Sequence, residues 1–138
     1  MSYLVDTNVI SELRRKRPDP NVADWFAKRS ASSLFLSVLT LGEIRKGIEK
    51  YTDPERRLLL VDWLEHDLPA YFRERILPID GAIADRWGRV QVEAGRPLPV
   101  IDSLLAATAH RHRLKMVTRN VDDFVGLSVD VINPWNRA

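Results

Sequence analysis

The stretch Tyr3-Leu4-Val5-Asp6-Thr7-Asn8 decides the fold that we expect for this chain. Three apolar residues followed at once by polar ones are typical of a short buried strand that ends at the edge of a sheet. In open α/β sheets, ligands bind outside the carboxyl ends of the strands. Asp6 therefore delivers a carboxylate to the edge where chemistry takes place.

Helical patterns separate this strand from further apolar runs. We expect strands at residues 33–37, 76–79, 115–118 and 129–132, and helices at 7–15, 20–29, 38–51, 55–65, 81–94 and 102–113. Asp80 is expected to cap the helix at 81–94, and Pro69 to kink or break a helix that resumes over 70–75. This alternation predicts a parallel sheet covered by helices on both faces. Right-handed crossovers then bring all the strand carboxyl ends to one edge.

Length and composition limit the class of protein. The 138 residues, of which 45% are hydrophobic and 29% charged, fit one soluble domain over residues 1–138. No apolar run is long enough to span a bilayer and the first residues do not form a secretory signal, so we expect a cytoplasmic location. The absence of cysteine excludes disulfides, thiolate catalysis and cysteine-based zinc sites.

The basic residues cluster, although the formal net charge is only +2. Arg14-Arg15-Lys16-Arg17 is a compact run, and a looser group comprises Arg111, Arg113, Lys115 and Arg119. The compact run has two interpretations: a solvated helix end that complements the helix dipole, or a phosphate-binding surface. The charge pattern alone leaves both open.

Four acidic residues are expected at the same sheet edge: Asp6, Glu43, Asp102 and Asp123. Asp102 is expected to begin a helix, whose dipole would keep its pKa low. Carboxylates about 4 Å apart repel by on the order of 4 kcal/mol per pair at an effective dielectric near 20. Either a divalent cation neutralises them or some stay protonated. We adopt the first interpretation, in which a divalent cation neutralises these carboxylates.

Each of these acids also has a purely structural interpretation. Asp6 with Asn8 fits an Asx turn, Asp102 a plain N-cap, and Asp122 and Asp123 a solvated loop. Thr40-Leu41-Gly42-Glu43 matches a capping box, although Ser37 is a competing N-cap. All of these structural roles would have to fall at one sheet edge by coincidence, which favours a functional site.

Carboxylate oxygens suit Mg²⁺ or Mn²⁺, and such ions promote in-line displacement at phosphorus. A phosphodiester substrate is expected, with Arg and Lys around the mouth holding neighbouring phosphates. One metal ion is the minimum, and four acids allow two. The histidines (His66, His110 and His112) make no ligand pattern, and motifs for a serine nucleophile or a nucleotide-binding loop are absent. Trp25, Trp63, Trp87 and Trp135 are expected in the core or at an interface rather than as base-stacking platforms.

Residues 58–64 (LLLVDWL) are more apolar than one core-facing stripe requires. One explanation is a helix buried on two sides. The other, which we favour, is a helix that completes a dimer interface.

Five blocks, in order along nearly the whole chain, resemble a PIN domain of the VapC or FitB type. They are Asp6-Thr7-Asn8-Val9-Ile10-Ser11-Glu12-Leu13, Ser37-Val38-Leu39-Thr40-Leu41-Gly42-Glu43-Ile44-Arg45-Lys46-Gly47, Asp102-Ser103-Leu104-Leu105-Ala106-Ala107-Thr108-Ala109, Thr118-Arg119-Asn120-Val121-Asp122-Asp123-Phe124 and Asn133-Pro134-Trp135. The resemblance implies a three-layer α/β/α sandwich with a central parallel sheet. It also implies a Mg²⁺-dependent endoribonuclease, the toxin of a type II toxin–antitoxin pair.

The same resemblance implies partners and residue roles. The partners are RNA as substrate, a second copy of the chain, and a small antitoxin that blocks the site and binds operator DNA. Asp6 and Asp102 would bind the metal directly and Glu43 would complete the site. Some relatives have Asp where this chain has Asn120, so we assign Asp123 as the fourth acid and Asn120 as an amide that shapes the site.

Two other functions remain as alternatives. A phosphatase would use Asp6 as a covalent nucleophile, but it generally needs a second Asp two residues on, where this chain has Asn8. A non-catalytic binding module would retain the fold as a scaffold or co-repressor. The presence of all the key acids argues against that module.

Overall fold

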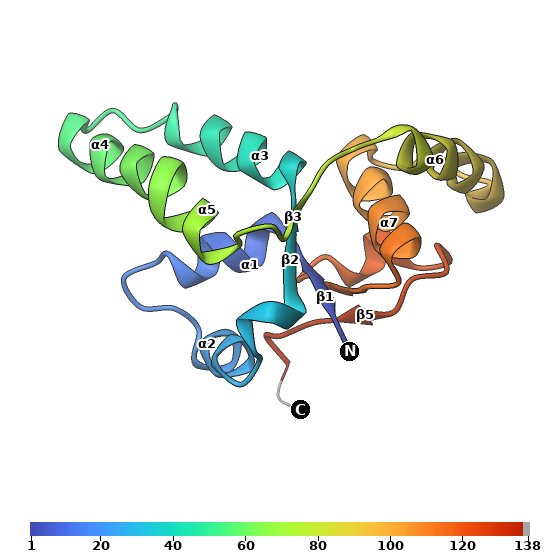
Figure 1. The fold of residues 1–138 in the computed structure, drawn as a ribbon, viewed down its shortest axis with the longest axis horizontal. Coiled ribbons are helices and arrows are strands. Elements are labelled where there is room, and N and C mark those ends of the chain that lie inside the picture. Colours follow the sequence, from blue (N-terminus) through green and yellow to red (C-terminus); the bar gives the residue numbers. More distant parts are fainter. Residues whose placement is uncertain (137–138) are drawn as a thin grey trace.

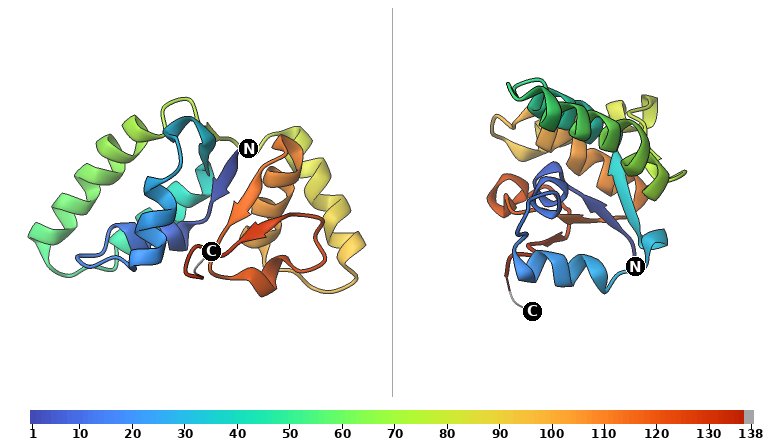
Figure 2. Two further views of the ribbon diagram at one scale, coloured as in Figure 1. Left: turned by 90° about the horizontal axis from the view of Figure 1, so that it is seen from below. Right: turned by 90° about the vertical axis from the view of Figure 1, so that its left-hand side faces the viewer.

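A parallel five-stranded sheet forms the centre of the molecule, and the computed structural model describes residues 1–136. The strand order is β3-β2-β1-β4-β5. The strands are β1 (Tyr3–Val5), β2 (Leu34–Ser37), β3 (Ile76–Leu77), β4 (Lys115–Val117) and β5 (Val131–Ile132). Helices cover both faces (Figures 1 and 2), so the predicted three-layer α/β/α fold is confirmed.

The alternation of side chains along β1 divides the core between the two faces of the sheet. Tyr3 and Val5 point into one cluster, and Leu4 points into the other. The helices on the first face are α1 (Thr7–Leu13), α2 (Pro20–Ala27), α3 (Val38–Ile48) and α5 (Leu68–Tyr71). The second face is covered by α6 (Gly81–Ala94) and α7 (Val100–His112). Buried β1 thus lies at the centre of the molecule, with its carboxyl end between the two helical layers.

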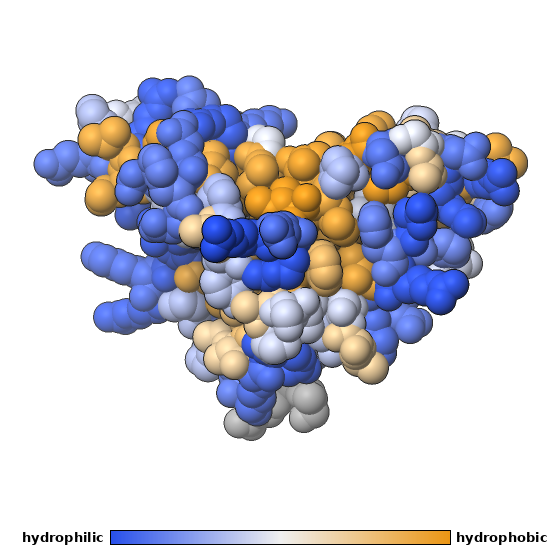
Figure 3. Space-filling view, viewed as in Figure 1, coloured by the Kyte–Doolittle hydropathy of each residue, from blue (hydrophilic) through white to orange (hydrophobic). Residues whose placement is uncertain are grey.

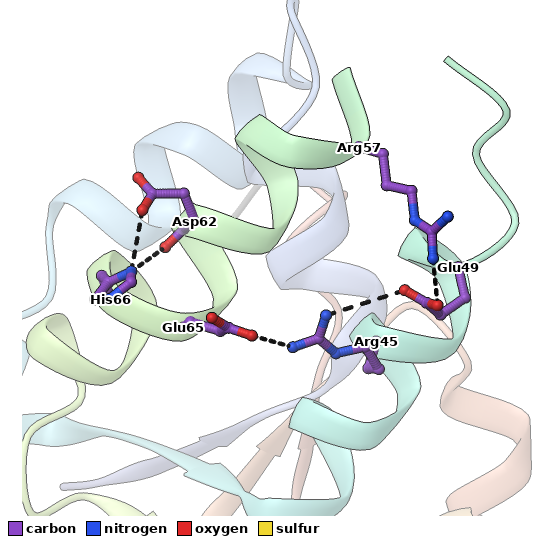
Figure 4. Close-up of polar contacts among 6 residues, drawn as sticks. All are labelled: Arg45, Glu49, Arg57, Asp62, Glu65 and His66. Carbon is purple, nitrogen blue, oxygen red and sulfur yellow. Dashed lines mark hydrogen bonds and ion pairs between the residues drawn. The ribbon is translucent and has the colours of Figure 1, made fainter. Parts of the chain in front are cut away.

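An arm made of α3 and α4 (Pro54–Asp62) leaves the first face of the sheet (Figure 1). Ion pairs on the surface, which Figure 4 shows, join α3 and the residue after it to α4 and to the π-helical turn that follows α4. Arg45 contacts Glu65 at 2.7 Å, and Arg57 pairs with Glu49. These pairs are exposed and each is worth at most about 1 kcal/mol. They orient the arm rather than hold the fold together.

Of the two effects expected of Pro69, a break in the helix is wrong, because the helix continues through a local distortion. The chain passes from α4 through a π-helical turn, η2 (Trp63–Asp67), directly into α5, where Pro69 lies in the first turn. Proline has no N–H to donate to the carbonyl four residues earlier and its ring clashes with that carbonyl. The wider π turn relieves this conflict. The helix then ends at Tyr71 and does not continue to residue 75.

The N-terminal ends of three helices test the sequence prediction. Helix α3 begins at Val38, as expected. Ser37, not Thr40, is the N-cap of α3, because its hydroxyl accepts the N–H of Leu39 at 3.1 Å. The capping box at Thr40–Glu43 is therefore wrong. Helix α7 starts at Val100, so Asp102 lies within its first turn instead of beginning it. Asp80 does cap α6, where its carboxylate accepts the N–H of Ile83 at 3.0 Å.

The apolar segment at 58–64 is not buried on two sides. Leu64 packs into the core, whereas Leu58 and Leu59 are 69% and 68% exposed. The interpretation as a doubly buried helix is therefore wrong for the single chain, and the dimer interface stays a prediction. Within residues 1–136, no helix has the length and apolar character needed to cross a membrane.

Candidate metal centre

An open cleft of about 580 Å³ lies at the carboxyl ends of the central strands. Volumes of roughly 300–1000 Å³ are usual for ligand sites. The cleft brings together residues from α1 and its ends, from α3 and its end, from α7, and from the segments after β4 and β5. They are Asp6, Thr7, Asn8, Ser11, Glu12, Arg15, Glu43, Tyr51, Asp102, Arg119, Asn120 and Trp135. Of the five site residues predicted from sequence, Asp6, Glu43, Asp102 and Asn120 line this cleft.

Asp6 is the most buried of the acids, with 5% of its surface exposed. It follows β1 and caps α1, where its Oδ1 accepts the N–H of Thr7 at 2.7 Å. Its Oδ2 accepts the hydroxyl of Thr118 at 2.8 Å. Burial raises the pKa of Asp6, the two hydrogen bonds lower it in part, and the charges of Glu43 and Asp123 raise it further. The fold thus holds a carboxylate where its charge is poorly compensated.

Thr118 connects the ends of the two central strands. Besides donating to Asp6, its hydroxyl accepts the side-chain amide of Asn8 at 3.1 Å and the backbone N–H of Asn120 at 3.0 Å. The side-chain amide of Asn8 also lies 3.5 Å from Asp6 Oδ2. Asx-turn pairing between Asp6 and Asn8 is therefore a minor part of a larger network.

Glu43 lies in the second turn of α3 and faces the start of α1. The hydroxyl of Thr7 donates to its Oε1 at 2.5 Å and lies 3.2 Å from the hydroxyl of Thr40. Thr7 directly follows Asp6 in the sequence, so its hydrogen bond to Glu43 orients that carboxylate toward Asp6.

Asp102 departs most from our expectation, because its pKa is raised to about 7 and not lowered. Desolvation is the largest cause, followed by contact with the side chain of Asp123 and by the charges of Asp6, Asp123 and Glu43. The helix dipole does not offset the field of three other carboxylates. Asp123, in the 3₁₀ turn η3 (Val121–Phe124), thus lies beside Asp102, although it does not line the cleft itself.

The sequence prediction missed several residues that line the cleft, among them Glu12, Tyr51 and Trp135. Glu12 had a readable signal, because Asn8, Glu12 and Arg15 are spaced four and three residues apart and so share one helix face. Tyr51 follows the end of α3 and had no such signal. Trp135 packs against the core, as we expected, but it also borders the cleft.

The donor set fits a hard divalent cation, since all four acids supply oxygen and they repel one another. None of the four is in an ion pair with a basic side chain within residues 1–136. Over that same range, no three acidic or histidine side chains form a closed set of metal ligands. The carboxylates instead surround the open cleft.

The fold and this acidic edge define a PIN domain, and residues 3–127 match that family. The chain belongs to the PIN-domain family. It is 33% identical to "Toxin FitB" of Neisseria gonorrhoeae over 96% of this chain and 98% of that protein. It is 32% identical to "VapC ribonuclease Y4jK" of Sinorhizobium fredii over 98% and 99% of the two chains. The solved structure "FitAB bound to IR36 DNA fragment" matches with a TM-score of 0.93 and 31% identity, covering 99% of this chain and 97% of that one.

Proposed function

We propose that this chain is a Mg²⁺-dependent endoribonuclease and the toxin of a type II toxin–antitoxin pair. The observation that carries the proposal is the group of uncompensated carboxylates at the carboxyl edge of the sheet, two of which have raised pKa values. The names of the relatives, a toxin and a VapC ribonuclease, support the same function. Mn²⁺ satisfies the same oxygen ligands.

Asp6 and Asp102 would bind the metal ion directly, and Glu43 and Asp123 would complete the site. The chemistry expected of such an ion is activation of water and stabilisation of charge on the phosphoryl oxygens. Hydrogen bonds from Thr118 and Thr7 fix the carboxylates of Asp6 and Glu43. These carboxylates are therefore oriented before the reaction, which lowers the free-energy cost of ordering them. Asn120 would shape the site as an amide beside them.

The partners that we propose are RNA, a cognate antitoxin, and a second copy of the chain. The related FitAB structure was solved with a DNA fragment, which supports a complex of toxin and antitoxin on operator DNA. In this proposal the antitoxin, and not this chain, contacts the DNA. A cytoplasmic location follows from such partners.

The experiment is incubation of purified, antitoxin-free protein with total cellular RNA. Discrete cleavage is expected with Mg²⁺ and is expected to disappear with a chelator or in Asp6→Asn. Asp122→Asn is the matched control, because Asp122 is an exposed acid next to Asp123. Its cleavage pattern should be that of the wild type. A folded, metal-supplied wild-type chain that leaves all RNA intact would favour the non-catalytic binding module instead.

A further inference from the structure

Arg119 occupies a defined place at the mouth of the carboxylate cleft. It follows β4 by two residues, and its backbone N–H donates to Oδ1 of Asn8 at 3.3 Å. The guanidinium carbon lies 5.1 Å from the centre of the Trp135 ring. The side chain is exposed, so its charge is accessible to a ligand in the cleft.

Arg119 differs from the other cation of the cleft in its charge balance. Arg15 pairs with Glu12 at 3.3 Å, so its charge is already balanced by a buried carboxylate. Arg119 forms no ion pair within residues 1–136, and its side chain is positioned by the indole alone. Contact with an aromatic face leaves the charge and the N–H donors at the edge of the guanidinium free to bind an anion.

Trp135 is itself held firmly. Its backbone N–H donates to Oδ1 of Asn133 at 2.9 Å, and its carbonyl accepts the side-chain amide of Asn21, on α2, at 2.9 Å. The ring packs against the core cluster on the first face of the sheet. The last described turn of the chain therefore fixes an aromatic surface next to the cleft.

We infer that Arg119 holds a phosphate of the RNA strand in the carboxylate cleft and that Trp135 is the positioning residue for its guanidinium. The acids of the cleft repel a polyanion, so a strand that enters needs a cation at this point. The planar guanidinium matches a phosphate in two parallel hydrogen bonds. This inference rests on the proposed ribonuclease function and assigns substrate binding within the same site.

The test measures cleavage kinetics of the full chain and binding of a labelled single-stranded RNA by the cleavage-deficient Asp6→Asn chain. Arg119→Ala is expected to raise KM roughly tenfold with little change in kcat, because it removes binding that is equal in the ground and transition states. It should also lower the salt slope of binding by about 0.7, the value for one phosphate contact on a single strand. Arg119→Lys should keep the salt slope but lose part of the affinity.

Arg89→Ala is the matched control, since it removes the same charge from α6, where Arg89 pairs with Asp85. Its KM should stay at the wild-type value. Trp135→Phe should lose less RNA affinity than Trp135→Ala, because a flat ring remains to contact the guanidinium. Trp135→Ala should share the loss seen in Arg119→Ala, and the double variant should bind no more weakly than Arg119→Ala alone.

Three outcomes would overturn the inference. The first is a KM in Arg119→Ala that matches that of Arg89→Ala. The second is an additive loss in the double variant together with a lower melting temperature, which would make Trp135 purely structural. The third is a wild-type chain that does not cleave RNA together with an Asp6→Asn chain that does not bind it, which would overturn the proposed function as well. If the wild type cleaves RNA and the KM of Arg119→Ala is unchanged, the inference about Arg119 fails while the proposed ribonuclease function stands.

Discussion

The carboxyl group of Asp102 makes the metal-free chain sensitive to pH. Its pKa rises to about 7 in the fold because of desolvation and neighbouring carboxylates, against about 3.9 in an unfolded chain. Between these values the folded chain binds more protons than the unfolded chain does. The free energy of unfolding therefore decreases as the pH rises from about 4 to about 7. The raised pKa of Asp6 acts in the same direction.

We expect Asp102→Asn to be more stable than the wild type at pH 8 without metal. Asp102 is partly exposed, so solvent screening leaves a gain on the order of 1–2 kcal/mol. Denaturant unfolding at several pH values in chelator measures the effect, and at pH 4 the difference should nearly vanish. Equal pH profiles for the two chains would mean that Asp102 ionises normally.

The hydroxyl of Thr118 is the second side-chain group that we expect to contribute measurably to stability. Its buried hydroxyl donates to Asp6 and accepts two N–H groups, so Thr118→Val removes three hydrogen bonds while keeping the volume of the side chain. Orphaning buried polar groups costs about 1–3 kcal/mol each at most, and we expect a total loss of about 2–3 kcal/mol. Urea unfolding measures it. Thr118→Ser keeps the hydroxyl and should lose much less.

At the scale of elements, one buried hydroxyl on α7 accepts hydrogen bonds from two side chains of α6, beside the apolar contacts between the two helices. Ser103 Oγ accepts the indole N–H of Trp87 at 2.9 Å and the amide of Gln91 at 3.0 Å, and it lies 2.7 Å from the carbonyl of Pro99. Ser103→Ala leaves two donors of α6 without this acceptor. A loss of about 1–3 kcal/mol is expected in thermal or urea unfolding. Ser32→Ala, at an exposed position, should change stability by less than about 0.5 kcal/mol.

Ser103 follows Asp102 directly, so the same variant tests whether α6 positions the proposed metal ligands. A shifted α7 would move the Asp102 carboxylate relative to Asp6. We therefore expect Ser103→Ala to weaken Mg²⁺ binding in calorimetry even at temperatures where the chain is fully folded. Unchanged Mg²⁺ binding would show that α6 stabilises α7 without determining the position of the Asp102 carboxylate.

The strands were predictable from local apolar patterns, and the convergence of the acids was predictable from the parallel topology that alternating strands and helices imply. An apolar run that stops at Asp6 places that residue at a strand end whatever its neighbours are. Parallel topology then brings this strand end to the same sheet edge as the other strand ends. The ionisation of Asp102 was not predictable, since it depends on Asp123 and Asp6 across the cleft. The start expected for α7 at Asp102 and the helix expected to continue to residue 75 were wrong, because helix ends depend on caps and turns that compete with tertiary packing.

For the molecule as a whole, mutual repulsion among the four acids predicts that a divalent cation stabilises the fold. At a concentration 100 times the Kd, an ion that binds only the folded chain adds about 2.7 kcal/mol to the free energy of unfolding. Differential scanning fluorimetry with Mg²⁺ or Mn²⁺ should raise the melting temperature by several degrees. Asp6→Asn should lose most of this shift and Asp122→Asn should retain it. A wild-type melting temperature that ignores both ions would contradict the metal centre.

The surface of the whole molecule also predicts self-association. Figure 3 shows apolar side chains gathered on the face between the α3–α4 arm and α7. On the arm itself, Leu58 and Leu59 are 69% and 68% exposed in the single chain, although the helix that carries them packs against the core through its other side. Exposed apolar patches of this kind are typical of interfaces between proteins.

A second copy of the chain is the occupant that we expect for the exposed leucines of the arm. Light scattering coupled to size exclusion should therefore give the mass of a dimer for the wild type. Leu58→Glu combined with Leu59→Glu should give the mass of a monomer, because burying two new carboxylates without partners costs more than the apolar contacts contribute. Val92→Glu is the matched control, since Val92 is 82% exposed on α6, away from the arm. A charged arm that still elutes as a dimer would place the interface on another face.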